Sequence, residues 1–94
     1  MEYTIGTEYK VIIKKRLLRQ VEKMPKFERK KLDALVADLR ASGPIRAEWM
    51  NYSKLSANEY HCHLSYHWVA CWRHEKETIE IEVYYAGSRE NAPY

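Results

Sequence analysis

A chain of 94 residues is long enough for one domain with a modest core and too short for two, so residues 1–94 are expected to form a single domain. Hydrophobic residues make up 46% of the chain and charged residues 31%, as in globular proteins with a well-solvated surface. No apolar run approaches the roughly 20 residues of a membrane-spanning helix, and the first residues lack the pattern of a signal peptide. We therefore expect a cytoplasmic protein without membrane contact.

The net charge of +3 is unevenly divided along the chain. Residues 1–46 hold 12 of the 16 Lys and Arg but six of the 13 Asp and Glu, which leaves +6 there and −3 in residues 47–94. The basic half suits nucleic acid or an acidic protein partner. Cys62 and Cys71 are too few for a disulfide framework and lack CxxC spacing, so both are expected to be buried structural residues.

The first half of the chain predicts a short strand followed by two helices. Glu2–Ile5 forms the strand, and Thr7 then caps a helix that runs to Lys23 and ends before Pro25. Its apolar residues fall close to the helical period: Tyr9, Ile12, Ile13, Leu17, Val21 and Met24.

A second helix is predicted from about Lys26 to Ala41, where Ser42-Gly43-Pro44 stops it. The short connection between the helices predicts an antiparallel hairpin. Residues 45–58 are expected to be irregular and to fold back on the core through Trp49, Met50 and Tyr52, with Lys54 exposed.

Three strand-like runs complete the chain: Glu59–Leu64, His67–Arg73 and Thr78–Tyr85. Short separators predict an antiparallel meander. A two-residue first turn pairs Cys62 with Val69, and a three-residue second turn pairs Cys71 with Ile79.

This register divides the side chains between two faces of the sheet. The face that the helices cover receives Cys62, Leu64, Val69, Cys71, Ile79 and Ile81, and Val83 and Tyr85 follow by alternation. The open face receives His61, His63, Trp68, Ala70, Trp72, Glu80, Glu82 and Tyr84. A slip of one residue in the last strand would bury its glutamates.

The open face combines imidazoles with exposed aromatic rings. His61 and His63 lie two residues apart and so leave the same face of a strand, where they could transfer protons or bind a metal. A metal is the weaker interpretation, because His-x-His is a loose pattern and His67 points to the other face. Trp68 and Trp72 could stack on RNA bases, or the loop 45–58 or the chain terminus could pack over them.

The end of the chain resembles the RelE-like toxins of bacterial toxin–antitoxin systems, within the RelE/ParE superfamily. In Gly87-Ser88-Arg89 the last strand runs into a Gly-x-Arg turn, and Tyr94 supplies an aromatic side chain a few residues later. The resemblance covers almost the whole chain. It implies an α+β fold with a short N-terminal strand, an antiparallel helix hairpin and a three-stranded antiparallel meander, with the helices packed on one sheet face.

The resemblance assigns roles to four residues. His61 and His63 stand where RelE has two lysines, and His63 also matches a catalytic histidine of YafQ-type relatives. Arg89 matches the phosphate-binding arginine or catalytic histidine of the turn, and Tyr94 the aromatic that orients or polarises the substrate. The chain departs from the family at Val69, where RelE has an arginine, and at His67, where YafQ-type relatives have an aspartate.

The activity implied is cleavage of messenger RNA in the ribosomal A site by attack of a 2′-OH on its own phosphate. This reaction uses neither metal nor cofactor. His63 would be the general base, with His61 assisting or acting as the acid; Arg89 would hold the phosphate, and Tyr94 would orient it. The resemblance also implies a cognate antitoxin in a hetero-oligomer. The residues expected to contact RNA are Trp68, Lys54, Lys14, Lys15, Lys30 and Lys31.

Two alternatives remain open from the sequence. A ParE-like member would poison gyrase and would not need His61 and His63. A non-catalytic member of the fold would use the aromatic face to bind RNA or protein.

Overall fold

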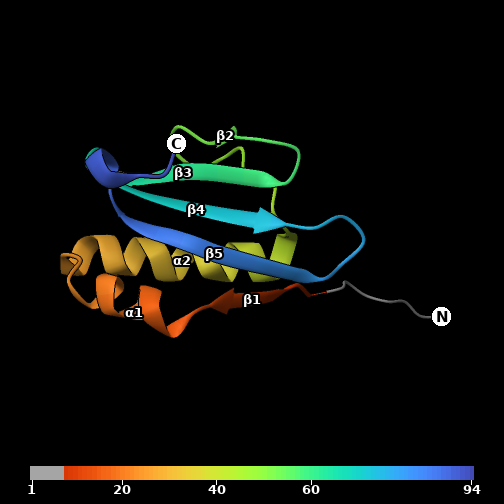
Figure 1. The fold of residues 1–94 in the computed structure, drawn as a ribbon, viewed down its shortest axis with the longest axis horizontal. Coiled ribbons are helices and arrows are strands. Elements are labelled where there is room, and N and C mark those ends of the chain that lie inside the picture. The colour runs from red at the N-terminus through yellow and green to blue at the C-terminus, as the bar shows by residue number, and fades with distance from the viewer. Residues whose placement is uncertain (1–7) are drawn as a thin grey trace.

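A run of β-branched residues, Val11 to Ile13, begins the chain's sheet. The computed structural model describes residues 8–94. In chain order the elements are β1 (Lys10–Ile13), α1 (Lys15–Glu22), α2 (Lys26–Ser42), β2 (Ser53–Lys54), β3 (Glu59–Ser65), β4 (Trp68–His74), β5 (Glu80–Ser88) and the 3-10 turn η1 (Arg89–Asn91). The strands form one mixed sheet in the order β1-β5-β4-β3-β2, with two helices packed on it (Figure 1). The predicted α+β class, the helix hairpin and the meander are confirmed.

The predicted first helix is wrong in its first half. Lys10–Ile13 are the strand β1, which pairs parallel to β5 with Val11 opposite Ile81. β-branched side chains favour strands, and the pairing satisfies the backbone groups, as when Lys10 N–H donates to Ile79 O at 2.7 Å. The helix is therefore only the eight residues of α1. The predicted strand Glu2–Ile5 and the predicted cap Thr7 lie outside the described residues.

The second helix follows the prediction closely. α2 ends at Gly43, whose φ of +93° is a conformation that favours glycine, and whose N–H donates to Leu39 O at 2.9 Å. Its buried residues, Leu32, Leu35 and Leu39, face the sheet. Neither α1 nor α2 is long and apolar enough to cross a membrane, and no other helix of residues 8–94 is.

The predicted register between β3 and β4 is wrong by one residue. The two turn residues are Tyr66 and His67, not Ser65 and Tyr66, and Cys62 therefore pairs with Ala70 rather than Val69. Since neighbouring residues of a strand point to opposite faces, this shift turns all of β4 over. Ala70 and Trp72 join the core under the helices, and Val69, Cys71 and Arg73 move to the face of the histidines.

The predicted register between β4 and β5 is also wrong, because residues 75–79 form a five-residue connection. Trp72 pairs with Val83, and Ile79 is exposed rather than buried. A bulge at Tyr84 follows, since the next pair is Cys71 with Tyr85. The bulge moves Tyr85 out of the core.

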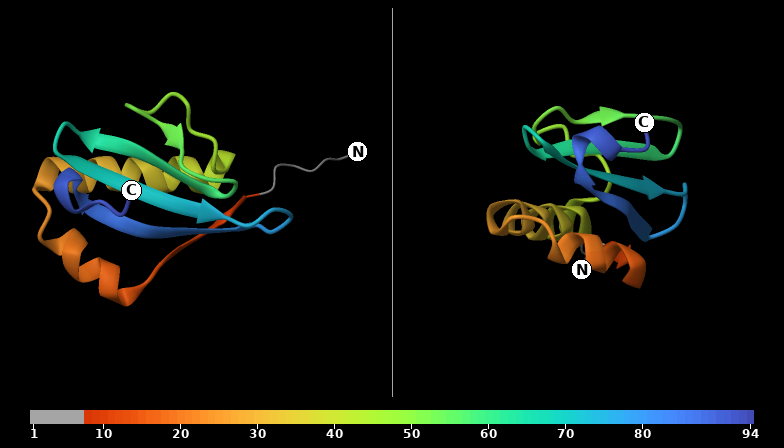
Figure 2. Two further views of the ribbon diagram at one scale, coloured as in Figure 1. Left: turned by 45° about the horizontal axis from the view of Figure 1, so that its top comes forward. Right: turned by 60° about the vertical axis from the view of Figure 1, so that its left-hand side comes forward.

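The core centres on Trp72, whose side chain is fully buried. Its indole N–H donates to Pro44 O at 3.0 Å, and its ring stacks on Tyr60 with centroids 6.0 Å apart. Tyr52 packs on the same rings, so the segment before β3 folds back on the core as predicted, although Met50 is exposed. Helices cover only one side of the sheet, and the chain's end crosses the other side near β3 (Figure 2).

Trp72→Ala should lower the free energy of unfolding by roughly 3–5 kcal/mol, because it removes a buried aromatic side chain and leaves a cavity. Urea unfolding of the variant and of Lys76→Ala, in the exposed β4–β5 turn, measures this difference. If Trp72→Ala lost as little stability as Lys76→Ala, Trp72 would not be a core residue.

Candidate functional site

The sheet face opposite the helices is called here the histidine face. It carries His61, Cys71 and Tyr85 in one row across three strands, because these residues pair directly in the sheet. His63 and Arg73 lie on the same face, each two residues from this row but on opposite sides of it, because β3 and β4 are antiparallel. Cys62 points to the core, and burial raises the pKa values of Cys62 and Cys71 to about 12, so neither thiol is reactive.

His61 is held by polar and aromatic contacts and is only 8% exposed. Its Nδ1 lies 3.0 Å from Ser53 Oγ, and its ring lies 4.3 Å from the Tyr94 ring between centroids. Burial lowers the pKa of His61 from its ordinary value of 6.5, and the neighbouring His63 lowers it further. His61 is therefore mostly neutral at pH 7.

His63 lies beside His61, with 5.8 Å between the ring centroids, and is 7% exposed. Its backbone N–H donates to Met50 O at 2.8 Å, which fixes the strand edge against the preceding loop. Its Nδ1 is buried without a hydrogen-bond partner among the described residues. The side chain borders a cavity of about 380 Å³, lined by Lys31, Glu48, Trp49, Met50, His63 and Leu64.

Tyr94 packs against His61, and Arg89 lies earlier in the same C-terminal segment. Burial raises the pKa of Tyr94, which keeps its hydroxyl protonated, while the Arg89 guanidinium opposes this shift. Arg89 is the first residue of η1, directly after the end of β5. Its guanidinium lies 4.7 Å from the centroid of the Tyr66 ring in the β3–β4 turn. The structure thus places His61 between His63 and Tyr94, with ring centroids 5.8 Å and 4.3 Å away, and holds Arg89 beside the β3–β4 turn.

The predicted RNA-binding lysines occupy different surfaces. Lys31 borders the His63 cavity, with Nζ 5.9 Å from the Trp49 ring. Lys54 lies over Tyr60 at 5.7 Å, and Lys14 pairs with Glu82 at 3.6 Å. Lys15 and Lys30 are exposed on the helices.

The predicted position of Trp68 on the open face is wrong. The shifted turn puts this half-buried side chain against the core instead, at a cavity it shares with Tyr85 and α1. Trp72 is buried for the same reason, so neither indole belongs to the histidine face.

Sequence reasoning missed Arg73 as a functional candidate. With the predicted register its side chain pointed to the core, whereas the observed pairing of His61 with Cys71 puts Arg73 on the histidine face. An arginine at the end of the apolar run Trp68–Trp72 was the available signal. Within residues 8–94, no three His, Cys, Asp or Glu side chains gather as metal ligands.

No family model and no curated protein matches this sequence. Solved structures do match the fold. The archaeal RelE of the RelE–RelB complex from Pyrococcus horikoshii aligns with a TM-score of 0.71 at 15% identity, over 92% of this chain and 100% of that chain. The isolated E. coli RelE toxin aligns with a TM-score of 0.68 at 20% identity, over 90% of this chain and 88% of its own.

A YoeB toxin has the same fold. The YoeB dimer from Staphylococcus aureus aligns with a TM-score of 0.66 at 10% identity, over 86% of this chain and 97% of that chain. The chain therefore has the fold of the RelE and YoeB toxins.

The lowered pKa of His61 predicts a loss of stability in acid. The unfolded chain binds a proton at His61 near pH 6.5, before the folded chain does, so stability falls as the pH drops from 6.5 through the lower folded pKa. Urea unfolding between about pH 8 and about pH 5 should show a shallower decline for His61→Asn than for the wild type. The exposed His67→Asn is the control and should keep the wild-type slope; equal slopes for all three proteins would contradict this interpretation.

Proposed function

We propose that this protein is the toxin of a toxin–antitoxin pair and inhibits translation by cutting messenger RNA on the ribosome. The observation that carries the proposal is the position of His61 beside both His63 and Tyr94 on the helix-free face of a RelE-like sheet. Imidazoles change protonation near neutral pH, so they suit proton transfer from an RNA hydroxyl. The reaction is attack of a 2′-OH on the adjacent phosphate and needs no metal or cofactor.

We assign the general base to His63. It borders a cavity, whereas Tyr94 and Ser53 occupy the surroundings of His61. A base must come within hydrogen-bonding reach of the 2′-proton, and this favours the imidazole with open space beside it.

His61 is assigned a supporting role. Its lowered pKa leaves little imidazolium at pH 7, which argues against His61 as the acid for the leaving 5′-oxygen. A neutral ring between Ser53 and Tyr94 can instead hold its neighbours in place. Tyr94 keeps its proton because burial raises its pKa, so we assign its hydroxyl to polarising the phosphate or the leaving oxygen.

Two cations are assigned to the phosphate. Lys31 borders the same cavity as His63, and Arg89 can offer a bidentate guanidinium from the neighbouring turn. Positive charge there would stabilise the charge that grows on the phosphate oxygens.

Docking to ribosomal RNA is assigned to the basic half of the chain. Lys14, Lys15 and Lys30 project from the helical part, and Lys54 is exposed on β2. Such contacts release counterions, so ribosome binding should weaken steeply with salt.

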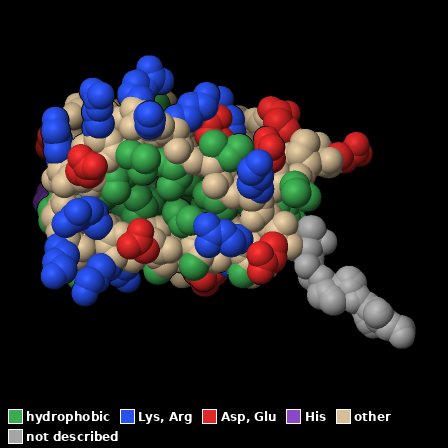
Figure 3. All heavy atoms as spheres, turned by 90° about the horizontal axis from the view of Figure 1, so that it is seen from below, with side chains coloured by type: hydrophobic (Ala, Val, Ile, Leu, Met, Phe, Trp, Pro, Cys, Tyr) green, Lys and Arg blue, Asp and Glu red, His purple; other side chains and the backbone are tan. Residues whose placement is uncertain are grey.

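An antitoxin would cover the apolar surface on the helical side of the molecule (Figure 3). Figure 3 shows a continuous hydrophobic surface there, with Lys and Arg around much of its rim. Leu18 and Phe27, 43% and 61% exposed, are the large exposed hydrophobic residues of α1 and α2. An amphipathic segment with acidic residues along its polar edges fits this surface. Solved neighbours form complexes with RelB and YefM, which supports a partner of this kind.

His63→Ala should reduce RNA cleavage by at least about a hundredfold, the usual share of a general base. The measurement is induction in a bacterial host with mapping of transcript ends, alongside growth. His67→Ala, which changes an exposed histidine four residues away, is the matched control and should cut like the wild type.

New transcript ends of equal abundance with His63→Ala and the wild type would refute the base assignment. If induction stopped growth without new transcript ends, a DNA-supercoiling assay would separate a gyrase poison from a binding protein. Growth arrest without new transcript ends would refute the proposed RNA cleavage, whichever of these two activities the supercoiling assay identified.

A further inference from the structure

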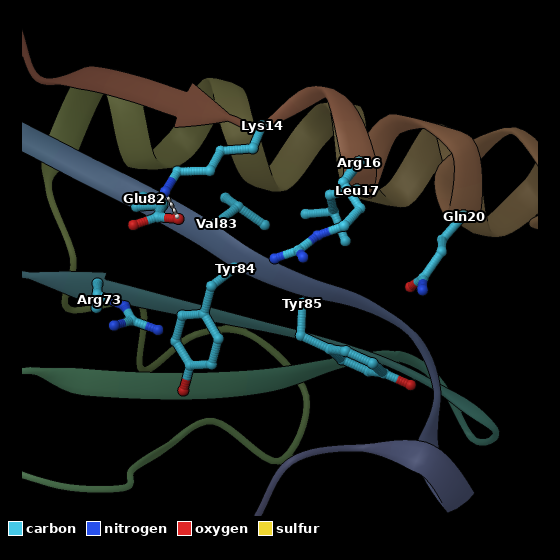
Figure 4. A pocket seen from close by; sticks show the side chains of 9 residues that line it. All are labelled: Lys14, Arg16, Leu17, Gln20, Arg73, Glu82, Val83, Tyr84 and Tyr85. Carbon is cyan, nitrogen blue, oxygen red and sulfur yellow. Dashed lines mark ion pairs between the residues drawn. The ribbon is translucent and has the colours of Figure 1, made fainter.

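A second cavity opens on the histidine face between α1 and the strands β4 and β5 (Figure 4). Its volume is about 420 Å³, within the range of small-ligand sites. Figure 4 shows side chains from both walls directed into it, Lys14 and Gln20 from the α1 side and Arg73 and two tyrosines from the sheet. The lining residues are Lys14, Arg16, Leu17, Gln20, Arg73, Glu82, Val83, Tyr84 and Tyr85.

Arg73 has unused hydrogen-bonding capacity in this cavity. Its guanidinium lies 4.1 Å from the centroid of the Tyr84 ring, which fixes its plane, but its Nε is buried with no partner among the described residues. Glu59 and Glu82 stand opposite Arg73 on the neighbouring strands. Neither makes an ion pair with Arg73 within residues 8–94, and Glu82 pairs with Lys14.

The cavity favours an anion. Lys14, Arg16 and Arg73 line it against the single carboxylate of Glu82. α1 also begins at this cavity, and its first turn contains no acidic residue and no side-chain cap, so the positive end of the helix is not neutralised there. The planar guanidinium of Arg73 can present two parallel N–H groups to an oxyanion in this cavity.

We infer that this cavity is a second phosphate subsite, which holds another backbone phosphate of the RNA strand that is cut. The inference rests on the proposed function. His63 pairs with Val69, and Arg73 is four residues farther along β4 on the same face, so the Cα atoms of His63 and Arg73 lie roughly 14 Å apart. An RNA strand lying against the histidine face passes from one site to the other. Tyr84 and Tyr85 offer rings to the sugar and base beside that phosphate.

The test measures coupling between Arg73 and a single phosphate. The probe is a 2′-O-methyl RNA tetranucleotide, which lacks the attacking hydroxyl, with each phosphate in turn replaced by a neutral methylphosphonate. Fluorescence anisotropy with purified protein gives the affinities, and neither the ribosome nor cleavage is needed. At one position the replacement should weaken wild-type binding by about tenfold or more but leave Arg73→Gln binding unchanged.

Three further variants complete the test. Arg16→Gln changes an exposed lining residue that can be removed without disturbing the core, and it should reduce the same phosphate's effect. Arg73→Lys keeps the positive charge but lacks the planar guanidinium, and it should recover part of the effect of that phosphate on affinity. Arg29→Gln, exposed on α2 outside the cavity, should lower the affinity for all probes by the same factor.

The inference would be overturned if each phosphate replacement weakened binding by the same factor in the wild type and in Arg73→Gln. It would also be overturned if the unmodified tetranucleotide did not bind. Inorganic phosphate that binds the wild type but not Arg73→Gln, without coupling to any RNA phosphate, would overturn the RNA assignment and leave a free-anion site. Coupling together with normal growth on induction would support the subsite while refuting the toxin function.

Discussion

The two-residue turn at Tyr66 and His67 is the constraint on which the rest of the sheet depends. It pairs His61 with Cys71 and Cys62 with Ala70, and these pairs decide the side on which every residue of β4 lies. With this register Trp72 is buried and donates its indole N–H to Pro44 O, which ties the end of α2 to the sheet. With a turn one residue earlier, the largest core side chain would face solvent and Arg73 would be buried beneath the helices.

The bulge at Tyr84 determines which side chains of β5 reach the core. Val83 and Ala86 both remain in the core although they are three residues apart, because the extra residue lets Tyr84 and Tyr85 leave it. The two tyrosines then line the histidine face, where Tyr84 supports the Arg73 guanidinium. An irregular strand pair thus supplies aromatic surface beside a cation without exposing the core.

The histidine face stores unfavourable free energy. His63 Nδ1 and Arg73 Nε are the two buried side-chain polar atoms without partners in the described part of the chain, and such a group costs about 1–3 kcal/mol. Burial also opposes the charged form of His61. These costs fall on two side chains, His63 and Arg73, each of which borders a cavity.

Local patterns in the sequence were enough to predict α2, the helix hairpin, the order of the three long strands and the common face of His61 and His63. Each of these follows from side-chain period or from a stop signal such as Gly43-Pro44. The tertiary structure alone decided that Lys10–Ile13 is a strand, since its partner β5 lies some seventy residues later. It likewise decided the turn at Tyr66, the bulge at Tyr84, the contact of Tyr94 with His61 and the exposure of Arg73 to a cavity. These depend on which backbone groups bond across the sheet, and a shift of one residue in that pairing exchanges the two faces without changing any local pattern.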